Sequence, residues 1–357
     1  MTVIDAFHLA NPTTAKPQLV ISFYSPTSLT YIQRLNTTET LVGSKQNMDA
    51  SIIVCTYNRA DSLKETLKAL YQQKVNQDLK WEVLVVDNNS SDHTRETVKT
   101  AQHSWPNLLY TSEQQQGLSH ARNHGIGCAK GKVLLFTDDD VLPEPGWLQT
   151  TLTGLHEHKA DACGGYIAPI WELPPPTWLT ERFYGFLAVR TDRTDDYPII
   201  ESGQAPFGAN MAVKKAVFNQ VGLFDTNRGR KGKVLASGED GELFERILAA
   251  ELKVVFLGSS RVHHKVESFR LTKQYMRNWR FQTSRNIAQS VGLKGTRRVL
   301  NIPLYIFPQL LRATLNMLWG KLSTPKDEAF NREIIICHFL GVIQGLYRIR
   351  NGGDTKH

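Results

Sequence analysis

The sequence predicts an α/β protein with a mostly parallel central sheet, helices on both faces, and a helical, basic C-terminal region. Between residues 49 and 145, continuous apolar runs alternate with helix-like stretches, and several runs end in acidic or polar residues. Continuous apolar runs are typical of strands buried on both faces of a sheet. The positive charge is concentrated after residue 260, which sets the C-terminal region apart.

The elements follow in a regular order along the first part of the chain. Strands are predicted at 51–56 (SIIVCT), 81–87 (WEVLVVD), 107–111 and 132–137 (KVLLFT), with helices at 62–72, 93–102 and 117–129. This alternation favours parallel strands joined by helical crossovers. Beyond Pro145 the predicted strands are 161–171, 207–213 and 253–257, and the predicted helices are 237–251, capped by Ser237, and 268–290.

The composition is that of a soluble globular protein. Hydrophobic residues make up 41% of the 357 residues and charged residues 21%, enough to form a sizeable core. We expect an N-terminal extension over 1–48, an α/β domain over 49–265 and a helical region over 266–357. The extension has a loosely ordered start and contains one strand-like run, residues 19–24.

The net charge of +8 is unevenly distributed. Residues 261–357 contain 17 Lys and Arg against 5 Asp and Glu, so residues 1–260 contain 25 against 29. This split argues against a nucleic-acid partner and favours a local basic surface. Residues 299–320 and 333–347 are predicted to be amphipathic helices at the cytoplasmic membrane surface. The alternative is a helical subdomain packed on the core.

The location is expected to be the cytoplasm, with peripheral attachment to the cytoplasmic membrane. The sequence shows no signal-peptide pattern and no run of about 20 apolar residues. None of the four cysteines forms a CxxC pair, which agrees with a reducing compartment. The cysteines are Cys55, Cys128, Cys163 and Cys337.

Polar and charged residues follow four of the predicted strands. They are residues 56–59, Asp87, residues 138–140, and the pair His263 and His264. Because ligands bind beyond the carboxyl ends of strands in open parallel sheets, we expect these groups to share one site.

The run Asp138-Asp139-Asp140 is the strongest of these signals. Adjacent carboxylates raise one another's pKa unless a cation neutralises them. In an extended segment Asp138 and Asp140 would point the same way, and hard oxygen ligands favour Mg²⁺ or Mn²⁺ bridging to a diphosphate. The alternative is a solvated acidic turn.

The other candidates are ambiguous on local grounds. Asp87 could bind a base or ribose, or cap the turn that follows it. Glu239 and Asp240 open a predicted helix, so they are either dipole partners or a general base. Arg59 and Arg122 are phosphate ligands or surface ion-pair partners. His264 is a ligand or a structural histidine.

Six stretches together resemble the family-two glycosyltransferases, which have a Rossmann-like sheet of the GT-A type. In order they are VCTYNRADSLKETLKAL at 54–70, EVLVVDNNSSDHT at 82–94, GLSHARNHGI at 117–126, VLLFTDDDV at 133–141, FGANMAV at 207–213 and SGEDGELFERI at 237–247. They cover roughly residues 50–290 and resemble the bacterial polysaccharide-biosynthesis type most. Residues 1–48 and those after about 295 lie outside the resemblance.

The resemblance implies a role for each matching residue. The nucleotide-sugar donor would be bound by Thr56, Asn58, Arg59, Asp87, Arg122, Asn123, Asp138 and Asp139. Asp87 would contact the base, most often uracil in this family. Mg²⁺ or Mn²⁺ would be held by Asp138, Asp140 and His264, with His263 as the alternative to His264. Asp240 matches the catalytic base, beside Glu239 in the same motif.

These roles imply an inverting transfer from a UDP-sugar or related donor to a hydroxyl of a glycan or lipid-linked acceptor. The metal would stabilise the departing diphosphate, and the basic loop 228–233 would close over it. Two other functions stay open. A sugar nucleotidyltransferase would need a glycine-rich loop after the first strand, where TYNRAD has no glycine. An inactive binding or scaffold subunit would not need the acidic set.

Overall fold

The computed structural model describes residues 48–230, 237–291 and 297–350. The predicted N-terminal extension lies almost entirely outside these residues, and so do Lys231 and Lys233 of the predicted basic loop. From residue 48 onward, the described residues form one compact unit. The boundary proposed between 265 and 266 stays a proposal.

The first half of the sheet is parallel, as its apolar runs predict. Its spatial order is β3 (Leu108–Ser112), β2 (Trp81–Asp87), β1 (Ala50–Thr56) and β4 (Val133–Asp138). The crossovers are α3 (Ala60–Tyr71), α4 (Thr94–Gln102) and α5 (Leu118–Cys128). All seven residues of β1 are buried, because both faces of the strand carry helices.

The second half of the sheet is mixed. β8 (Met211–Lys214) runs antiparallel to β4 and to β6 (Ala162–Trp171). β9 (Val254–Val266) is parallel to β6 but antiparallel to β5 (Val141–Pro143) and β7 (Tyr197–Ile199). The predicted α/β fold with a central sheet between helices is confirmed, and the antiparallel strands lie beyond β4.

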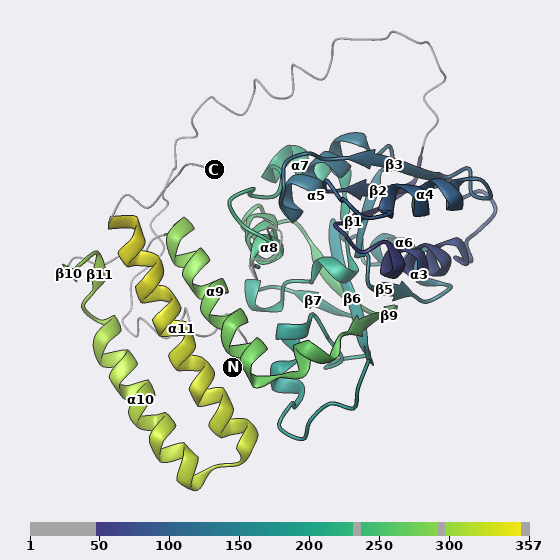
Figure 1. Cartoon of the computed structure of the whole chain (residues 1–357). Helices are drawn as coiled ribbons and strands as arrows, with labels where there is room; N and C mark the ends of the chain where they lie inside the picture. Colours follow the sequence, from purple (N-terminus) through teal and green to yellow (C-terminus); the bar gives the residue numbers. More distant parts are fainter. Residues whose placement is uncertain (1–47, 231–236, 292–296, 351–357) are drawn as a thin grey trace. The chain divides into compact units, whose positions relative to one another are not determined.

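Helices cover both faces of this sheet (Figure 1). One hydrophobic core joins Ile52 and Val83 to α3, α4 and α6 (Trp147–Glu157). The other joins Ile53 and Leu84 to α5, α7 (Lys215–Val221) and α8 (Glu239–Ala249). Alternate strand residues face opposite sides, which explains why neighbours in β1 enter different cores.

Several predicted boundaries are wrong. The helices predicted at 268–290 and 299–320 begin only at Lys273 and Ile306. The strand expected at 207–213 begins at Met211, after a 3₁₀ turn over Gly208–Asn210. The strand expected at 253–257 continues to Val266. From residue 261 onward buried and partly exposed residues alternate, so a search for continuous apolar residues misses this part. His263 and His264 therefore lie within β9, not after it.

The C-terminal region contains α9 (Lys273–Val291), the short strands β10 (Arg298–Val299) and β11 (Ile302–Pro303), α10 (Ile306–Ser323) and α11 (Lys326–Arg350). Figure 1 shows α11 between α9 and α10. Gly341 and Gly345 of α11 lie directly against the backbone of α9, where a side chain would collide with carbonyl oxygens. Glycine thus permits the close approach of these two helices.

An aromatic cluster fastens α9 and α11 to the α/β part of the chain. The ring of Phe330 lies 5.0 Å from that of Trp178 and 5.3 Å from that of Phe183. The rings of Trp279 and Phe186 are 4.8 Å apart. Both α9 and α11 therefore pack against the α/β part, and contact of the C-terminal region with a membrane stays a proposal. Within the described residues, no helix has both the length and the hydropathy needed to cross a bilayer.

Candidate active site

The carboxyl ends of β1, β2 and β4 lie side by side at one edge of the sheet. Thr56 pairs with Asp87, and Cys55 pairs with Asp138, across the two parallel ladders. In β9, His264 pairs with Val141, the residue that directly follows the acidic run. The structure therefore brings the groups at the predicted strand ends together, including a histidine that comes from the middle of a strand.

The acidic run turns sharply at this edge. β4 ends at Asp138, and Asp139 and Asp140 form the turn into β5. Asp139 accepts a hydrogen bond of 2.7 Å from Thr56 Oγ1 and lies 3.2 Å from Arg59 Nε. Asp140 lies 3.0 Å from Arg59 Nη2. Arg59 thus holds two neighbouring carboxylates, an arrangement stronger than the surface ion pair considered from the sequence.

His264 approaches Asp140 from β9, the strand that pairs antiparallel with β5. Its Nε2 lies 3.4 Å from Asp140 Oδ1 and 3.3 Å from Nη1 of Arg270. The imidazole is buried, and its Nδ1 has no hydrogen-bond partner among the described residues. His263, the alternative ligand, points elsewhere and pairs with Glu144 at 3.2 Å. The geometry therefore favours His264 over His263.

The crowded carboxylates have divergent pKa values. Burial, followed by repulsion from Asp140, raises the pKa of Asp139 to about 7. Burial also raises the pKa of Asp138, with repulsion from Asp140 adding to it. For Asp140, burial is outweighed by His264 and Arg59, which hold its pKa well below the ordinary range. Because burial and repulsion raise the pKa of Asp138 and Asp139, an added cation would stabilise their ionised forms.

Arg122 connects the acidic run to the N-terminus of α8. Its side chain is only 3% exposed, and its Nη1 donates to Asp240 Oδ1 at 2.6 Å and to Glu239 Oε1 at 3.2 Å. Its Nη2 lies 3.8 Å from Asp138 Oδ1. Burial alone would lower the pKa of Arg122, but attraction by Asp240 and Glu239 raises it above its ordinary value. One guanidinium therefore spans the two predicted catalytic segments.

Asp240 is held at both carboxylate oxygens. Oδ1 accepts from Arg122, and Oδ2 accepts a hydrogen bond of 2.8 Å from the backbone N–H of Gly208. A side chain at residue 208 would collide with the guanidinium, so glycine is required for this close approach. The carboxylate side chain of Asp240 keeps 18% exposure. It is thus fixed in position while still reachable by a ligand.

The predicted cap of this helix is wrong. α8 begins at Glu239 with Gly238 as the N-cap, at φ +111°, and no side chain caps it. Ser237 Oγ instead lies 3.4 Å from Thr283 Oγ1 of α9. Glycine tolerates the left-handed backbone that turns the chain into the helix. Asp240 is consequently the second residue of α8, where the helix dipole favours a negative charge.

Glu239 lies beside Asp240 but in a different environment. It is 5% exposed, and its Oε2 has no hydrogen-bond partner among the described residues. Burial, with repulsion from Asp240, raises the pKa of Glu239 to about 7. Near neutral pH it can therefore bind a proton, which reduces the negative charge around its neighbour.

Asn58 and Asp87 join the loops that follow β1 and β2. Asn58 Oδ1 accepts from the N–H of Ser91 at 2.7 Å, and its own N–H donates to Ser90 Oγ at 2.9 Å. Asp87 accepts from the N–H of Ser90 at 2.9 Å and from the hydroxyl of Tyr110 at 2.7 Å. Asp87 therefore does cap a turn. Its contact with a base stays a prediction.

An open polar cavity of about 260 Å³ lies beside these loops. It is lined by Asn58, Arg59, Ala60, Asp61, Ser62, Asp92 and Glu267. Arg59 forms its boundary with the acidic run, so a ligand in the cavity would be next to Asp139 and Asp140.

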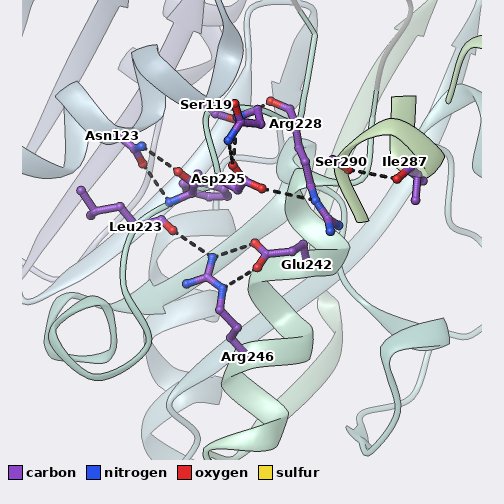
Figure 2. Close-up of polar contacts among 11 residues, drawn as sticks. Ser119, Asn123, Leu223, Asp225, Arg228, Glu242, Arg246, Ile287 and Ser290 are labelled. Carbon is purple, nitrogen blue, oxygen red and sulfur yellow. Dashed lines mark hydrogen bonds and ion pairs between the residues drawn. The ribbon is translucent and has the colours of Figure 1, made fainter. Parts of the chain in front are cut away.

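Asn123 anchors the segment after α7. Its side-chain amide donates to the carbonyl oxygen of Phe224 and accepts from the N–H of the same residue, both at 2.9 Å. Ser119 Oγ donates to the carbonyl oxygen of Arg228, and Arg228 lies 3.5 Å from Asp225 (Figure 2). The predicted contact of Asn123 with the donor stays a prediction.

The predicted basic loop begins in this anchored segment. The N–H of Leu118 donates to the carbonyl oxygen of Arg230 at 2.9 Å, so the start of the loop is tied to α5. Arg228 is paired with Asp225 and is 17% exposed. Closure of this loop over a diphosphate stays a prediction.

Sequence reasoning missed several residues that shape the site. Asn88 accepts from the N–H of Gly117 at 2.8 Å and donates to the carbonyl oxygen of Gln115 at 2.7 Å, which fixes the entry to α5. In the sequence, the only signal for a structural role of Asn88 was its position directly after a strand. Arg270, which contacts His264, belongs to a region with no motif.

The donor chemistry of the acidic run fits a divalent cation. Asp138 and Asp140 supply hard carboxylate oxygens and His264 an imidazole nitrogen, a set that suits Mn²⁺ or Mg²⁺. The described residues, as they stand, contain no group of three or more His, Cys, Asp or Glu side chains positioned to hold a metal. Asp140 pairs with Arg59 and His264, whereas Asp138 lies 3.8 Å from Arg122, so the two carboxylates have different partners here.

The chain has the GT-A fold, the fold of known glycosyltransferases. A mannosyltransferase from Pyrobaculum calidifontis, solved with GDP-Man and Mn²⁺, superposes with a TM-score of 0.54 at 19% identity. The superposition covers 89% of this chain and 94% of the mannosyltransferase chain. GalNAc-T7, solved with UDP, GalNAc and Mn²⁺, gives a TM-score of 0.50 at 20% identity, with coverages of 70% and 53%. These likenesses show the fold.

The family is shown by sequence. The profile of glycosyl transferase family 2 matches residues 51–221. A glucosyl-dolichyl phosphate glucuronosyltransferase of Haloferax volcanii is 30% identical over 232 residues, which are 62% of this chain and 71% of the relative. The chain therefore belongs to glycosyl transferase family 2, and the family resemblance predicted from the motifs is confirmed.

Proposed function

We propose that this glycosyltransferase moves a sugar from a nucleoside-diphosphate sugar, with UDP as the expected nucleotide, to an acceptor hydroxyl with inversion at the anomeric carbon. The observation that carries the proposal is the ion-pair bridge from Asp138 through Arg122 to Asp240. It brings two carboxylates from distant parts of the sequence to one edge of the sheet. Asp138 is proposed to act at the diphosphate, and Asp240 is the candidate base. A single displacement needs these two functions on opposite sides of one sugar.

The donor is proposed to bind along the edge between the β2 loop and the acidic run. Thr56, Asn58, Arg59, Asp87, Arg122, Asn123, Asp138 and Asp139 would form this subsite. Asp87 is proposed to face the base, and Asp139, which is already paired with Arg59 and Thr56, the ribose or sugar. Support for a nucleoside diphosphate comes from the GDP-Man and UDP named for the two solved structures.

Asp138, Asp140 and His264 would hold Mn²⁺ or Mg²⁺. When bound, the cation supplies Lewis-acid stabilisation of the negative charge that develops on the departing diphosphate. Arg59 lies 3.0 Å from Asp140 and can add positive charge beside that oxygen cluster. Mn²⁺ is named for both solved structures.

Asp240 is proposed to take the proton from the acceptor hydroxyl as its oxygen attacks. A base must be fixed in position, and Arg122 with the N–H of Gly208 holds the Asp240 carboxylate at both oxygens. Glu239, with its raised pKa, is proposed to tune the charge at Asp240 and to contact no substrate. Attack from the Asp240 side, away from the leaving diphosphate, inverts the anomeric centre.

The acceptor is proposed to be lipid-linked or a growing glycan, in polysaccharide or glycoconjugate synthesis. The relative in Haloferax volcanii is named for transfer to a dolichyl phosphate-linked sugar. A peripheral position at the cytoplasmic membrane would give the site access to such an acceptor.

A screen of nucleotide sugars tests the proposal. With Mn²⁺ present, one nucleotide sugar should raise the melting temperature, since a ligand at 100 times its Kd adds about 2.7 kcal/mol to the free energy of unfolding. A chelator should remove most of this shift. Incubation with the matching donor should then release free nucleoside diphosphate.

Two results would contradict the proposal. Release of pyrophosphate from a sugar phosphate and a nucleoside triphosphate would identify a nucleotidyltransferase. Donor binding without any release of nucleoside diphosphate, with or without acceptor, would identify an inactive binding subunit. Neither result would disturb the family assignment, which rests on sequence.

A further inference from the structure

The helix α10 presents a row of large apolar side chains to solvent. Leu311, Leu315 and Leu318 are 61%, 57% and 54% exposed. Trp319 is 72% and Phe307 41% exposed. Their spacing of three or four residues places them on one side of the helix, and we call these five residues the outer face of α10. Soluble proteins usually expose such side chains singly, so a continuous row indicates a contact surface.

The opposite face of α10 already has a partner in α11. Ile306 is 3% exposed and belongs to a core shared with Val342 and Leu346 of α11. Gly320 is buried against the side chain of Arg332. Figure 1 shows α10 on the far side of α11 from α9, at the edge of the helical layer. The packing of the helical region therefore uses one face of α10, while Leu311, Leu315 and Leu318 on the outer face stay more than half exposed.

The segment that contains α10 carries charge of one sign. From residue 297 to residue 326 the sequence has five Lys and Arg and no Asp or Glu. Arg297 and Arg298 precede α10, Arg312 is exposed on its flank, and Lys326 follows it. Basic side chains beside an apolar face complement an anionic headgroup layer. A symmetric pairing of two α10 helices would instead bring two positive segments together.

The dimensions also suit a helix that lies along a membrane surface. No described helix is long and apolar enough to cross a bilayer. The 18 residues of α10 span about 27 Å, with an apolar face and a polar flank that includes Arg312 and Asn316. Trp319 and Phe307, near opposite ends of the helix, are of the aromatic type that favours the boundary between headgroups and acyl chains.

We propose that the outer face of α10 docks on the surface of an anionic lipid bilayer, with the helix axis along the membrane plane. The aromatic cluster of Trp178, Phe183 and Phe330 would then transmit this attachment to the α/β part, because it connects α11 to the core. The inference is independent of the proposed transfer reaction, since it concerns binding to lipid alone.

Co-sedimentation of the full chain with vesicles tests the proposal, in the absence of donor and metal. The protein should bind vesicles of phosphatidylcholine mixed with phosphatidylglycerol, bind less at high salt, and bind weakly to phosphatidylcholine alone. The double variant Leu311→Glu, Leu315→Glu should lower binding to the mixed vesicles by roughly tenfold or more, because two inserted leucines are lost.

A matched variant carries the same two added charges elsewhere. Tyr71 and Ile200 are 56% and 76% exposed on the α/β part, so Tyr71→Glu, Ile200→Glu should bind like the native protein. Melting temperatures close to native for both variants show that each is folded. The proposal is overturned if native protein ignores anionic vesicles, or if the α10 variant binds as well as the matched one. It is also overturned if the α10 substitutions merely split a lipid-free dimer.

Discussion

Replacing Asp240 by Asn should reduce kcat by about 10²–10⁴-fold and leave donor affinity nearly unchanged. The amide keeps the size of the carboxylate, but its single oxygen can accept from only one of Arg122 and Gly208, and it cannot take a proton. Turnover of the identified donor and acceptor measures kcat, and a nucleoside-diphosphate titration measures affinity. A loss of kcat without a loss of donor affinity is the result that identifies a base.

The control for this variant lies on the same helix. Glu242 is also in the first turn of α8, but its carboxylate pairs with Arg246 at 2.8 Å (Figure 2). Glu242→Gln should keep kcat within about twofold of native, because the residue lacks contact with the acidic run. If Asp240→Asn turned over like Glu242→Gln, the assignment of the base would be wrong.

Replacing Arg122 by Met should lower the free energy of unfolding by about 3–5 kcal/mol, as expected when one partner of a buried ion pair is removed. The loss leaves Asp240 and Glu239 without their shared cation in a buried place. Urea denaturation measures the change. We also expect the variant to lose activity, because Asp240 would be held only by Gly208.

Two further variants separate position from charge. Arg122→Lys keeps one positive charge but cannot bridge Asp138 and Asp240 with two nitrogens, so it should fold and still lose most of its kcat. Arg246→Met removes a partly exposed arginine of α8 and should cost only about 1–2 kcal/mol. An Arg122→Met protein as stable as native would show that the bridge is absent in solution.

The parallel half of the fold was predictable because its information is local. WEVLVVD and KVLLFT carry the continuous apolar pattern of doubly covered strands, and the polar residues after them mark the edge where ligands bind. The antiparallel strands beyond β4 were not predicted as such, since pairing direction depends on residues far apart. The alternation of buried and partly exposed residues after Gly258 was harder to recognise, because two of its positions are the polar residues His263 and His264.

The site was predictable in its members but not in its connections. The motifs selected Asp138 and Asp240, yet nothing local indicates that Arg122 holds both, because the two partners belong to different segments. Likewise Asn123 reads as a donor ligand in its motif, whereas its amide is bonded on both sides to Phe224. Hydrogen bonds of this kind are set by tertiary packing, which sequence patterns do not encode.

The location of the cation tests the central claim most directly. Crystals grown with Mn²⁺ and the matching nucleoside diphosphate should show an anomalous peak bound by Asp138 and Asp140, with the carboxylate of Asp240 across the sugar site from the diphosphate. His264 is expected as the third protein ligand. A nucleotide bound away from the acidic run, or a Mn²⁺ peak with no ligand among residues 138–140, would contradict the account.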